Sequence, residues 1–291
     1  MKEVAPNPSG HVWHGGTMTQ YRIYDHRGPQ PRPRILVVIP FYNAAPWINE
    51  CVAKLAMNDE PHDILVVDDG SNPPLDIATS DNLVVCRFRC NAGLVTALNL
   101  AASFAMSQGY SYYVRQDADD FSRPDRLRLQ REAIEREGAD LVVSGVNAVD
   151  EDGRTIWSGY MTADERAFRR ALSVRNPVVH STWFMRTDLF AEIGCYDERF
   201  KGAEDFELLQ RIARNGKIAL VPHELVDYLV RPGSVLSASR GPAWQTLRIV
   251  TRYFDPARLT SYVGIARATG AAIFSRRLKT SARRILRDIR R

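Results

Sequence analysis

Two groups of aspartates follow short hydrophobic runs of the sequence. Asp68 and Asp69 come directly after one run, and the segment Asp117–Asp120, which contains three aspartates, follows another. Ligands of open parallel sheets bind beyond the carboxyl ends of the strands, so we expect these carboxylates at one edge. Like charges held that close raise the energy unless a cation or a bound ligand offsets them. Aspartate is also common in turns and helix caps, but two such groups at successive strand ends favour a ligand site.

The spacing of Asp117 and Asp119 indicates the kind of ligand. Side chains alternate along an extended segment, so both carboxylates point to the same side. Two such oxygens suit Mg²⁺ or Mn²⁺, which keep several waters and take further ligands from phosphates. The sequence contains neither G-x-G-x-x-G nor G-x-x-x-x-G-K, which argues against a Rossmann dehydrogenase and a P-loop enzyme. The pattern therefore predicts a nucleotide-diphosphate compound held through its metal.

A third acidic pair, Glu204 and Asp205, opens a predicted helix after a glycine-containing loop. In one interpretation the pair only complements the positive end of the helix dipole, which contributes less than about 1 kcal/mol. In the other, one of them is a general base held by a rigid helix start. Their position alone leaves both interpretations open.

His180 and Trp183 lie in a mixed apolar segment that we predict to be a strand. A lone histidine in such a place is more often a core residue than a ligand. Trp183 could stack on the face of an acceptor sugar, although core packing is the favoured interpretation. The sequence has no H-E-x-x-H pattern and no G-x-S-x-G elbow, so a zinc protease or a serine hydrolase has no support.

The elements that must position these residues alternate between strand and helix. Continuous apolar runs predict strands, and apolar residues at helical spacing predict helices. This alternation with short connections predicts an α/β fold with a mostly parallel central sheet and flanking helices. The expected strands lie at 35–39, 64–67, 83–86, 110–114, 141–144, 178–185, 218–221 and 225–230, and the expected helices at 46–57, 93–105, 125–137, 163–172, 204–214 and from about 242.

The composition is that of an ordinary globular protein, with 45% hydrophobic and 25% charged residues, which excludes disordered, collagen-like and disulfide-rich classes. The four cysteines are scattered, as in a reducing compartment. No apolar run approaches the roughly 18 residues that span a bilayer, and the first thirty residues do not resemble a signal peptide. We therefore expect a cytoplasmic protein.

The charge is unevenly distributed along the 291 residues. The net charge is +5, but residues 260–291 carry +8 and the remainder carries −3. A nucleic-acid-binding domain is therefore not expected. The segment 276–291 interleaves arginines with leucine and isoleucine, which fits a solvated helix or, preferably, an anionic membrane surface. We divide the chain into an irregular N-terminal arm (1–33), a main domain (34–240, with halves 34–120 and 121–240) and basic C-terminal helices (241–291).

Five motifs in order resemble those of family 2 glycosyltransferases with the GT-A fold. The resemblance covers about residues 34–235 and leaves the two ends unexplained. Each motif alone is weak, but the family's order makes the set specific. The motifs are Ile39-Pro40-Phe41-Tyr42-Asn43, Val66-Val67-Asp68-Asp69-Gly70-Ser71, Asn91-Ala92-Gly93-Leu94, Asp117-Ala118-Asp119-Asp120 with Pro124, and Glu204-Asp205.

The resemblance implies an inverting, metal-dependent transfer of a sugar from a nucleotide diphosphate to an acceptor hydroxyl. By position, Pro40 and Tyr42 belong to the first nucleotide-binding loop, and Asp69 matches the acid that holds the base, usually uracil. The implied metal is Mn²⁺ or Mg²⁺, which offsets charge on the leaving diphosphate.

The resemblance also assigns the carboxylates. Asp117 and Asp119 match the pair that meets the ribose and the metal, with Asp120 beside them. Asp205 matches the catalytic base, and Glu204 precedes it. The base removes the proton as the acceptor oxygen attacks the anomeric carbon from the opposite face.

One position departs from the family pattern. Many members carry Tyr-Arg-x-His-Pro-Gly-Ser near the end of the domain, where the histidine approaches the metal or the diphosphate. This chain has Tyr228-Leu229-Val230-Arg231-Pro232-Gly233-Ser234. Arginine cannot ligate a metal but can pair with phosphate oxygens through two hydrogen bonds. We therefore predict that Arg231 binds the diphosphate.

The expected activity is transfer of a hexosyl or N-acetylhexosaminyl group, from a UDP-sugar, to a glycan or lipid-linked acceptor in cell-surface polysaccharide or glycolipid assembly. The basic segment would hold the protein at the inner face of the membrane. Two alternatives are a domain that binds nucleotide sugar or a partner without turnover and, less favoured, a sugar nucleotidyltransferase. The latter normally needs a glycine-rich basic loop after its first strand, which the Phe41–Ala45 segment is not.

Overall fold

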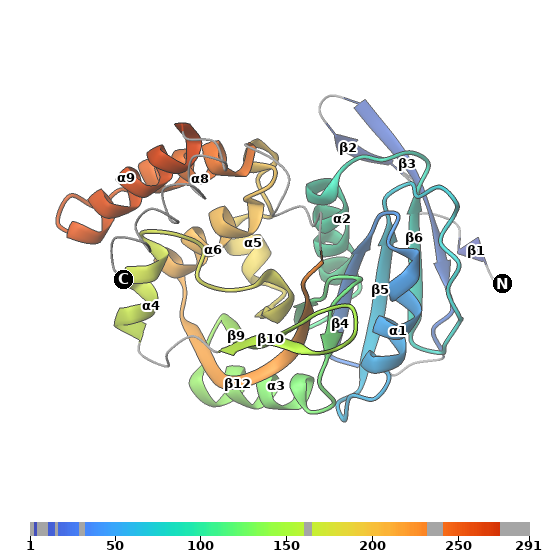
Figure 1. Ribbon diagram of the computed structural model, residues 1–291. Helices are drawn as coiled ribbons and strands as arrows, with labels where there is room; N and C mark the ends of the chain where they lie inside the picture. Colours follow the sequence, from blue (N-terminus) through green and yellow to red (C-terminus); the bar gives the residue numbers. More distant parts are fainter. Residues whose placement is uncertain are drawn as a thin grey trace.

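The computed structural model describes residues 3–4, 11–14, 17–28, 33–159, 165–231 and 241–273. A twelve-stranded sheet runs through these residues, with helices packed against it (Figure 1). Its strand order is β1-β3-β6-β5-β4-β7-β11-β9-β12-β8, with β10 paired to β9 and β2 to β3. The α/β prediction is therefore confirmed.

The centre of the sheet is parallel. Each of its strands is a run of apolar residues, because both faces are covered. Leu36 and Val38 contribute to one core, and Ile35, Val37 and Ile39 to the other. The four central strands are β4 (Ile35–Phe41), β5 (His62–Asp68), β6 (Leu83–Phe88) and β7 (Tyr112–Arg115).

The flanks of the sheet are mostly antiparallel. β11 pairs antiparallel with β7 and β9, while β9 and β12 are parallel. Parallel pairing thus holds for the centre and for β9–β12, and the sheet as a whole is mixed. These flanking strands are β8 (Phe121–Ser122), β9 (Leu141–Val149), β10 (Thr155–Gly159), β11 (Phe184–Arg186) and β12 (Ile218–Leu229).

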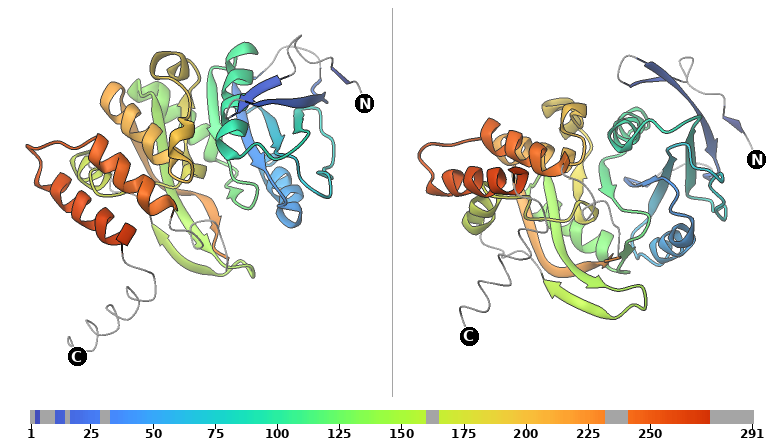
Figure 2. Two further views of the ribbon diagram at one scale, coloured as in Figure 1. Left: turned by 90° about the horizontal axis from the view of Figure 1, so that it is seen from above. Right: turned by 45° about the horizontal axis from the view of Figure 1, so that its top comes forward.

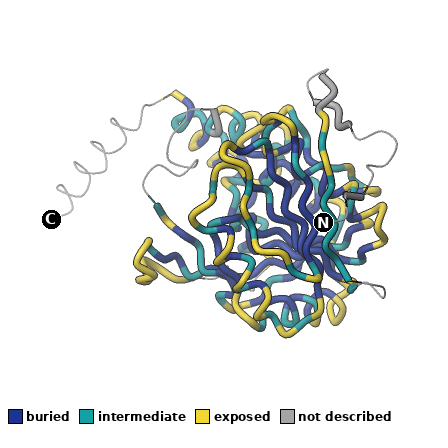
Figure 3. The backbone as a smooth tube through the Cα atoms, turned by 90° about the vertical axis from the view of Figure 1, so that its right-hand side faces the viewer, coloured by how far each residue is buried: buried dark blue, intermediate teal, exposed yellow. Residues whose placement is uncertain are grey.

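The helices form two layers. One face of the sheet packs on α1 (Ala45–Leu55) and α3 (Arg126–Glu137). The other face packs on a larger set, and the sheet between the layers is buried (Figure 3). That set comprises α2 (Leu94–Ser107), α4 (Glu165–Leu172), α5 (Leu189–Ile193), α6 (Glu204–Asn215), α8 (Gly241–Arg252) and α9 (Leu259–Ile273), with short 3₁₀ helices at η1 (His180–Thr182) and η2 (Glu198–Phe200).

The N-terminal region is more regular than we predicted. Instead of an irregular arm, residues 1–33 contain β1 (Glu3–Val4), β2 (His11–His14) and β3 (Thr17–Asp25), and β3 extends the sheet beside β6. Arg27, two residues after β3, pairs with Asp25 at 2.6 Å and donates to the Tyr110 hydroxyl at 2.7 Å. Tyr110 in turn donates to Asp63 on β5. This buried network fastens the end of β3 to the body of the protein.

Two predictions in the second half are corrected. The strand expected at 178–185 is a 3₁₀ turn, η1, followed by the shorter β11, because Thr182 and Trp183 turn their backbone amides onto the carbonyls of Val179 and His180. The two strands expected at 218–221 and 225–230 are one long strand, β12, whose register against β9 shifts between Val221 and Val226.

The C-terminal helices α8 and α9 lie side by side at the edge of the molecule away from β1–β3 (Figures 1 and 2). Ile249 and Val250 of α8 are buried in the core that includes α6. The predicted helices beyond residue 241 are thus present through residue 273, and the segment 276–291 lies outside the described residues. No helix among the described residues is both long and apolar enough to cross a membrane.

Candidate active site

The carboxyl ends of β4, β5 and β7 meet at one edge of the sheet. Phe41 and Asp68 are paired in register, and the Asp69 amide donates to the Phe41 carbonyl at 2.9 Å. Asn43 follows β4 with φ of 51°, and its backbone amide donates to the Ser71 hydroxyl oxygen at 3.0 Å, while its side-chain oxygen accepts a hydrogen bond from the Asn72 amide at 3.0 Å. The first two loops are therefore locked together.

The first loop leaves one aromatic ring open to solvent. Pro40 is the half-buried penultimate residue of β4, in register with Val67. Tyr42 follows directly and is 52% exposed. Its ring can therefore contact a ligand at the edge without a change in the core.

Asp69 is buried and faces the start of α2. Its two carboxylate oxygens accept hydrogen bonds from the Ala92 amide at 2.6 Å and the Gly93 amide at 2.9 Å. The chain approaches so closely here that a Cβ on Gly70 would lie 2.5 Å from the Cys90 carbonyl carbon. Asp69 thus fixes the loop that leads into α2, within the region where a nucleotide base would be expected.

Asp117 is held by a buried arginine. Its Oδ1 pairs with Arg115 at 2.5 Å, and its Oδ2 accepts a hydrogen bond from the Ser181 hydroxyl at 2.8 Å. Burial favours the protonated acid, but the Arg115 guanidinium and Ser181 outweigh burial and hold the pKa of Asp117 below its ordinary value. Asp117 is therefore charged at neutral pH.

Asp120 lies in the same segment but behaves differently. It is almost completely buried, and its Oδ1 accepts a hydrogen bond from the Leu229 amide of β12 at 3.1 Å. Burial, followed by the charge of Asp117, raises the pKa of Asp120 well above its ordinary value. We assign Asp120 to fastening this loop onto β12, because a buried acid of raised pKa is a poor metal ligand.

Asp119 is paired with Arg231, which is the last described residue before the gap at 232–240. Its Oδ2 receives hydrogen bonds from Arg231 Nε at 3.1 Å and Nη2 at 2.8 Å. The guanidinium lies over the ring of Trp47, 4.4 Å from its centre. Arg231 is thus placed beside the metal-binding candidate, while Pro232, Gly233 and Ser234 lie outside the described residues.

Asp205 is the candidate base. It is the second residue of α6, where the Phe206 amide donates to Oδ1 and the Asn176 side chain donates to Oδ2, both at 2.7 Å. Burial raises the pKa of Asp205 to about 7, and the charges of Glu204 and Asp117 add to this effect. A carboxylate with this pKa accepts a proton far better at neutral pH than an ordinary aspartate does.

Glu204 has a structural role and is not the candidate base. It is 5% exposed, and its Oε2 accepts a hydrogen bond from the Gly202 amide at 2.6 Å. Burial raises its pKa. Glu204 therefore closes the turn that precedes α6, and its charge tunes the neighbouring Asp205.

His180 and Trp183 belong to the core. His180 Nε2 lies 2.9 Å from the Tyr196 hydroxyl, and its ring meets that of Trp183 edge to face at 4.8 Å. Burial, with the nearby Arg115, lowers the pKa of His180 well below its ordinary value. Trp183 is completely buried, so its ring has no open face for a sugar.

The carboxylates suit a metal only in combination with a ligand. Among the described residues no three His, Cys, Asp or Glu side chains converge as a metal site. Asp119 and Asp117 are partly exposed, and Mg²⁺ or Mn²⁺ commonly binds one or two carboxylates and completes its shell with phosphate oxygens and water. The donor set therefore fits a divalent cation that arrives with a diphosphate.

Three residues of the site lie outside the motifs found in the sequence. Arg115 is the last residue of the buried strand β7, and Arg126 follows Pro124 and Asp125 at the start of α3. Both are fully buried. A charged residue in an apolar strand could have identified Arg115 as part of the site from the sequence. The contact of Asn176 with Asp205 could not be predicted in this way, because it depends on how distant segments fold together.

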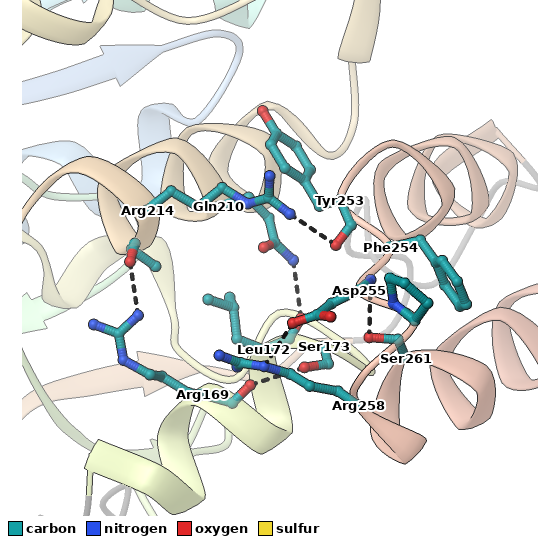
Figure 4. A pocket seen from close by; sticks show the side chains of 12 residues that line it. Arg169, Leu172, Ser173, Gln210, Arg214, Tyr253, Phe254, Asp255, Arg258 and Ser261 are labelled. Carbon is teal, nitrogen blue, oxygen red and sulfur yellow. Dashed lines mark hydrogen bonds and ion pairs between the residues drawn. The ribbon is translucent and has the colours of Figure 1, made fainter.

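A pocket of about 410 Å³ lies apart from these carboxylates, between α4, α6 and the connection from α8 to α9 (Figure 4). Arg214, in the last turn of α6, donates to the Tyr253 carbonyl at 3.0 Å, and Arg169 of α4 donates to the Ala213 carbonyl at 2.7 Å. Asp205 stands at the opposite end of α6. The pocket therefore marks the junction between the C-terminal helices and the main body.

Comparison with known proteins identifies the family to which this chain is similar. The model of the family described as glycosyl transferase family 2 matches residues 36–194, more than half of the chain. A relative from Rickettsia typhi, named an uncharacterized glycosyltransferase, is 26% identical over 193 residues. This alignment covers 62% of the chain and 59% of the relative, so the chain spans less than two thirds of that protein.

Two solved structures share the fold. S. aureus TarS (residues 1–349) in complex with UDP-GlcNAc aligns with a TM-score of 0.60 and 20% identity, over 83% of this chain and 73% of that chain. The mannosyltransferase PcManGT from Pyrobaculum calidifontis, in complex with GDP-Man and Mn²⁺, aligns with a TM-score of 0.57 and 18% identity, over 90% and 82%. The predicted GT-A type of fold is confirmed.

Proposed function

Because this chain belongs to glycosyl transferase family 2, we propose that it transfers a sugar from a nucleotide diphosphate to an acceptor hydroxyl. The observation that carries the proposal is the position of Asp205. Its pKa is about 7, and it lies close enough to Asp117 for the charge of Asp117 to raise that pKa. In this proposal a proton acceptor would act near the carboxylates that suit a diphosphate and its cation.

In the proposed reaction, Asp205 takes the proton of the acceptor hydroxyl as its oxygen attacks the anomeric carbon. The bond from that carbon to the diphosphate oxygen breaks, and the diphosphate leaves with the electron pair. Attack from the face opposite the diphosphate inverts the configuration. Asn176 and the Phe206 amide hold the carboxylate in a fixed orientation, which is the condition for efficient general base catalysis.

The donor would lie along the edge formed by β4, β5 and β7. Asp119 and Asp117 would hold Mn²⁺ or Mg²⁺, which when bound offsets negative charge on the diphosphate. Arg231 would pair with phosphate oxygens while remaining near Asp119. Pro40 and Tyr42 would line the nucleotide, and Asp69 would fix the loop beside the base.

The proposal also covers the donor, the acceptor and the location in the cell. The two structural neighbours were solved with UDP-GlcNAc and with GDP-Man. Asp69 matches the family acid that usually holds uracil, so we propose a UDP-hexose or UDP-N-acetylhexosamine as donor. A glycan or lipid-linked acceptor in polysaccharide or glycolipid assembly is proposed. The protein would act on the cytoplasmic side, at the inner face of the membrane.

The proposal is tested by thermal unfolding with UDP, GDP, CDP and dTDP, each with and without Mn²⁺. A ligand that binds only the native state stabilises it by about 2.7 kcal/mol at a hundred times its Kd, which corresponds to a rise in Tm of roughly 5 °C. We expect such a rise with one nucleotide, UDP, and only when Mn²⁺ is present. The rise should disappear in Asp119→Ala.

The matched control is Asp152→Ala, which removes an exposed aspartate from the turn between β9 and β10 and should keep the full rise. If no nucleotide changes the Tm, with or without metal, the proposed donor site is wrong. A response to UDP that Asp119→Ala leaves intact would instead remove Asp119 from the metal site.

Arg231→Ala gives a separate test of the diphosphate contact. Hydrogen bonds to charged groups contribute about 1.5–3 kcal/mol, so the Kd for UDP with Mn²⁺ should rise roughly ten- to a hundredfold. Titration calorimetry measures this change. Arg199→Ala, which removes an exposed arginine paired with Asp197 at 2.6 Å, should leave the Kd unchanged. An unaltered Kd in Arg231→Ala would show that Arg231 only neutralises Asp119.

A further inference from the structure

Trp47 lies where the first loop of the site passes into a helix. It is the third residue of α1, and its amide donates to the Ala44 carbonyl at 3.2 Å in the turn that opens the helix. The indole is half-buried and packs against the core to which Ile48 of the same helix belongs. The core therefore holds the ring in place and leaves part of its surface for a further contact.

The guanidinium of Arg231 makes that contact. Its central carbon lies 4.4 Å from the centre of the Trp47 ring, well within the distance of about 6 Å at which a cation is attracted by the face of an indole. The same guanidinium donates from Nε and Nη2 to Asp119 Oδ2. The three side chains thus connect the start of α1, the segment after β7 and the residues that follow β12.

The two contacts make different demands on the guanidinium. Its five N–H groups lie in one plane, so a contact of the cation with the face of a ring uses none of them. Asp119 engages Nε and Nη2, and its side chain and that of Arg231 are 24% and 31% exposed. A ligand at the edge can therefore reach both residues. Trp47 can hold Arg231 while the N–H groups exchange Asp119 for another anionic partner.

We propose that Trp47 is a positioning residue, which keeps Arg231 at the donor site while the guanidinium turns its N–H groups from Asp119 to the phosphate oxygens of the donor. When Asp119 binds a cation, Arg231 loses its carboxylate partner and retains the ring. A side chain held in advance loses less conformational entropy when the donor binds. This role of Trp47 rests on the proposed function and adds to it a residue outside the sequence motifs.

Titration calorimetry with UDP in the presence of Mn²⁺ tests the role in binding. Trp47→Leu keeps an apolar side chain against the core but removes the ring face, so the Kd for UDP should rise about three- to tenfold. Trp47→Phe restores a ring face and should bring the Kd to within about twofold of the wild type. In the Arg231→Ala background, Trp47→Leu should change the Kd no further, because the ring acts only through Arg231.

The matched control is Trp244→Leu, which makes the same substitution at a half-exposed tryptophan of α8, on the side of the molecule away from β1–β3 (Figure 2). Its Kd for UDP should equal that of the wild type. The proposal is overturned if Trp47→Leu leaves the Kd unchanged. It is also overturned if Trp47→Leu raises the Kd equally in the Arg231→Ala background, because Trp47 would then contact the nucleotide itself.

The contact is measured in the free protein by urea unfolding of the wild type, Trp47→Leu, Arg231→Ala and the double variant. Such a double-mutant cycle isolates the coupling between the two side chains. The double variant should lose less unfolding free energy than the two single variants together, because either substitution alone breaks the same contact. Additive losses with normal UDP binding would overturn the role of Trp47 alone. A wild type that binds no nucleotide would overturn this role together with the proposed function.

Discussion

Asparagine in place of Asp205 is expected to lower kcat by about 10²- to 10⁴-fold, because general base catalysis contributes rate enhancement of that order. The amide is close in shape to the carboxylate and can still accept the Phe206 hydrogen bond, so the fold and nucleotide binding should be retained. Turnover of a UDP-sugar in the presence of Mn²⁺, with an acceptor that supports measurable transfer by the wild type, gives the comparison. Full activity in Asp205→Asn would remove Asp205 from the role of base.

The pH dependence gives the same residue an independent signature. The base must be deprotonated, and burial raises the pKa of Asp205 to about 7. The wild-type kcat/KM should therefore be level above about pH 7 and fall by about tenfold per pH unit below it. Glu204→Gln removes a negative charge that raises this pKa, so its profile should shift to lower pH. A wild-type profile that stays level down to pH 5 would contradict the assignment.

Methionine in place of Arg126 is expected to lower the free energy of unfolding by about 3–5 kcal/mol. The guanidinium is fully buried and donates to the side chains of Gln116, Ser122 and Gln130 and to the Arg115 carbonyl, at 2.6–3.0 Å. Its removal takes a donor from these buried acceptors; the Gln116 oxygen still accepts from the Ser122 hydroxyl, and the loss at the others costs desolvation free energy. It also removes a positive charge beneath the acidic edge.

Urea unfolding of Arg126→Met and Arg128→Met measures the difference on one helix. Arg128 is 38% exposed and pairs with Asp59 at 2.7 Å, and exposed ion pairs contribute at most about 1 kcal/mol. The midpoint should fall strongly in the first variant and little in the second, with similar slopes. Equal losses of unfolding free energy would mean that the buried hydrogen bonds of Arg126 stabilise the protein no more than the exposed ion pair of Arg128.

The edge that carries the site was predictable because it depends on local patterns. The apolar runs of β4, β5 and β7 indicate strands buried on both faces, and parallel strands bring their carboxyl ends together. Asp69 and Asp117 therefore follow from the sequence as neighbours in one region. The family motifs then added Asp205, whose role could not be decided from its position alone.

The features that the sequence did not predict depend on contacts between distant segments. β3 pairs with β6, about sixty residues further along the chain, and is held by the hydrogen bond from Arg27 to Tyr110, so its place in the sheet cannot be predicted from residues 17–25 alone. The burial of Arg115 and Arg126 requires acceptors from several elements to converge. The 3₁₀ turn at His180 is closed by backbone hydrogen bonds, and its imidazole contacts the Tyr196 hydroxyl, where the apolar composition alone suggested a strand.

The attachment of the C-terminal helices has a consequence for recombination between relatives. Glu207, two residues after Asp205 on α6, accepts a hydrogen bond from the Tyr253 hydroxyl at 2.8 Å, and Arg214 holds the Tyr253 carbonyl. Ile249 and Val250 fill the core beside the same helix. A chimera that exchanges the donor half while keeping 204–273 from one parent preserves these contacts, whereas a crossover near residue 240 separates α6 from its partners. Helices α6, α8 and α9 should therefore be taken from the same parent in a chimera.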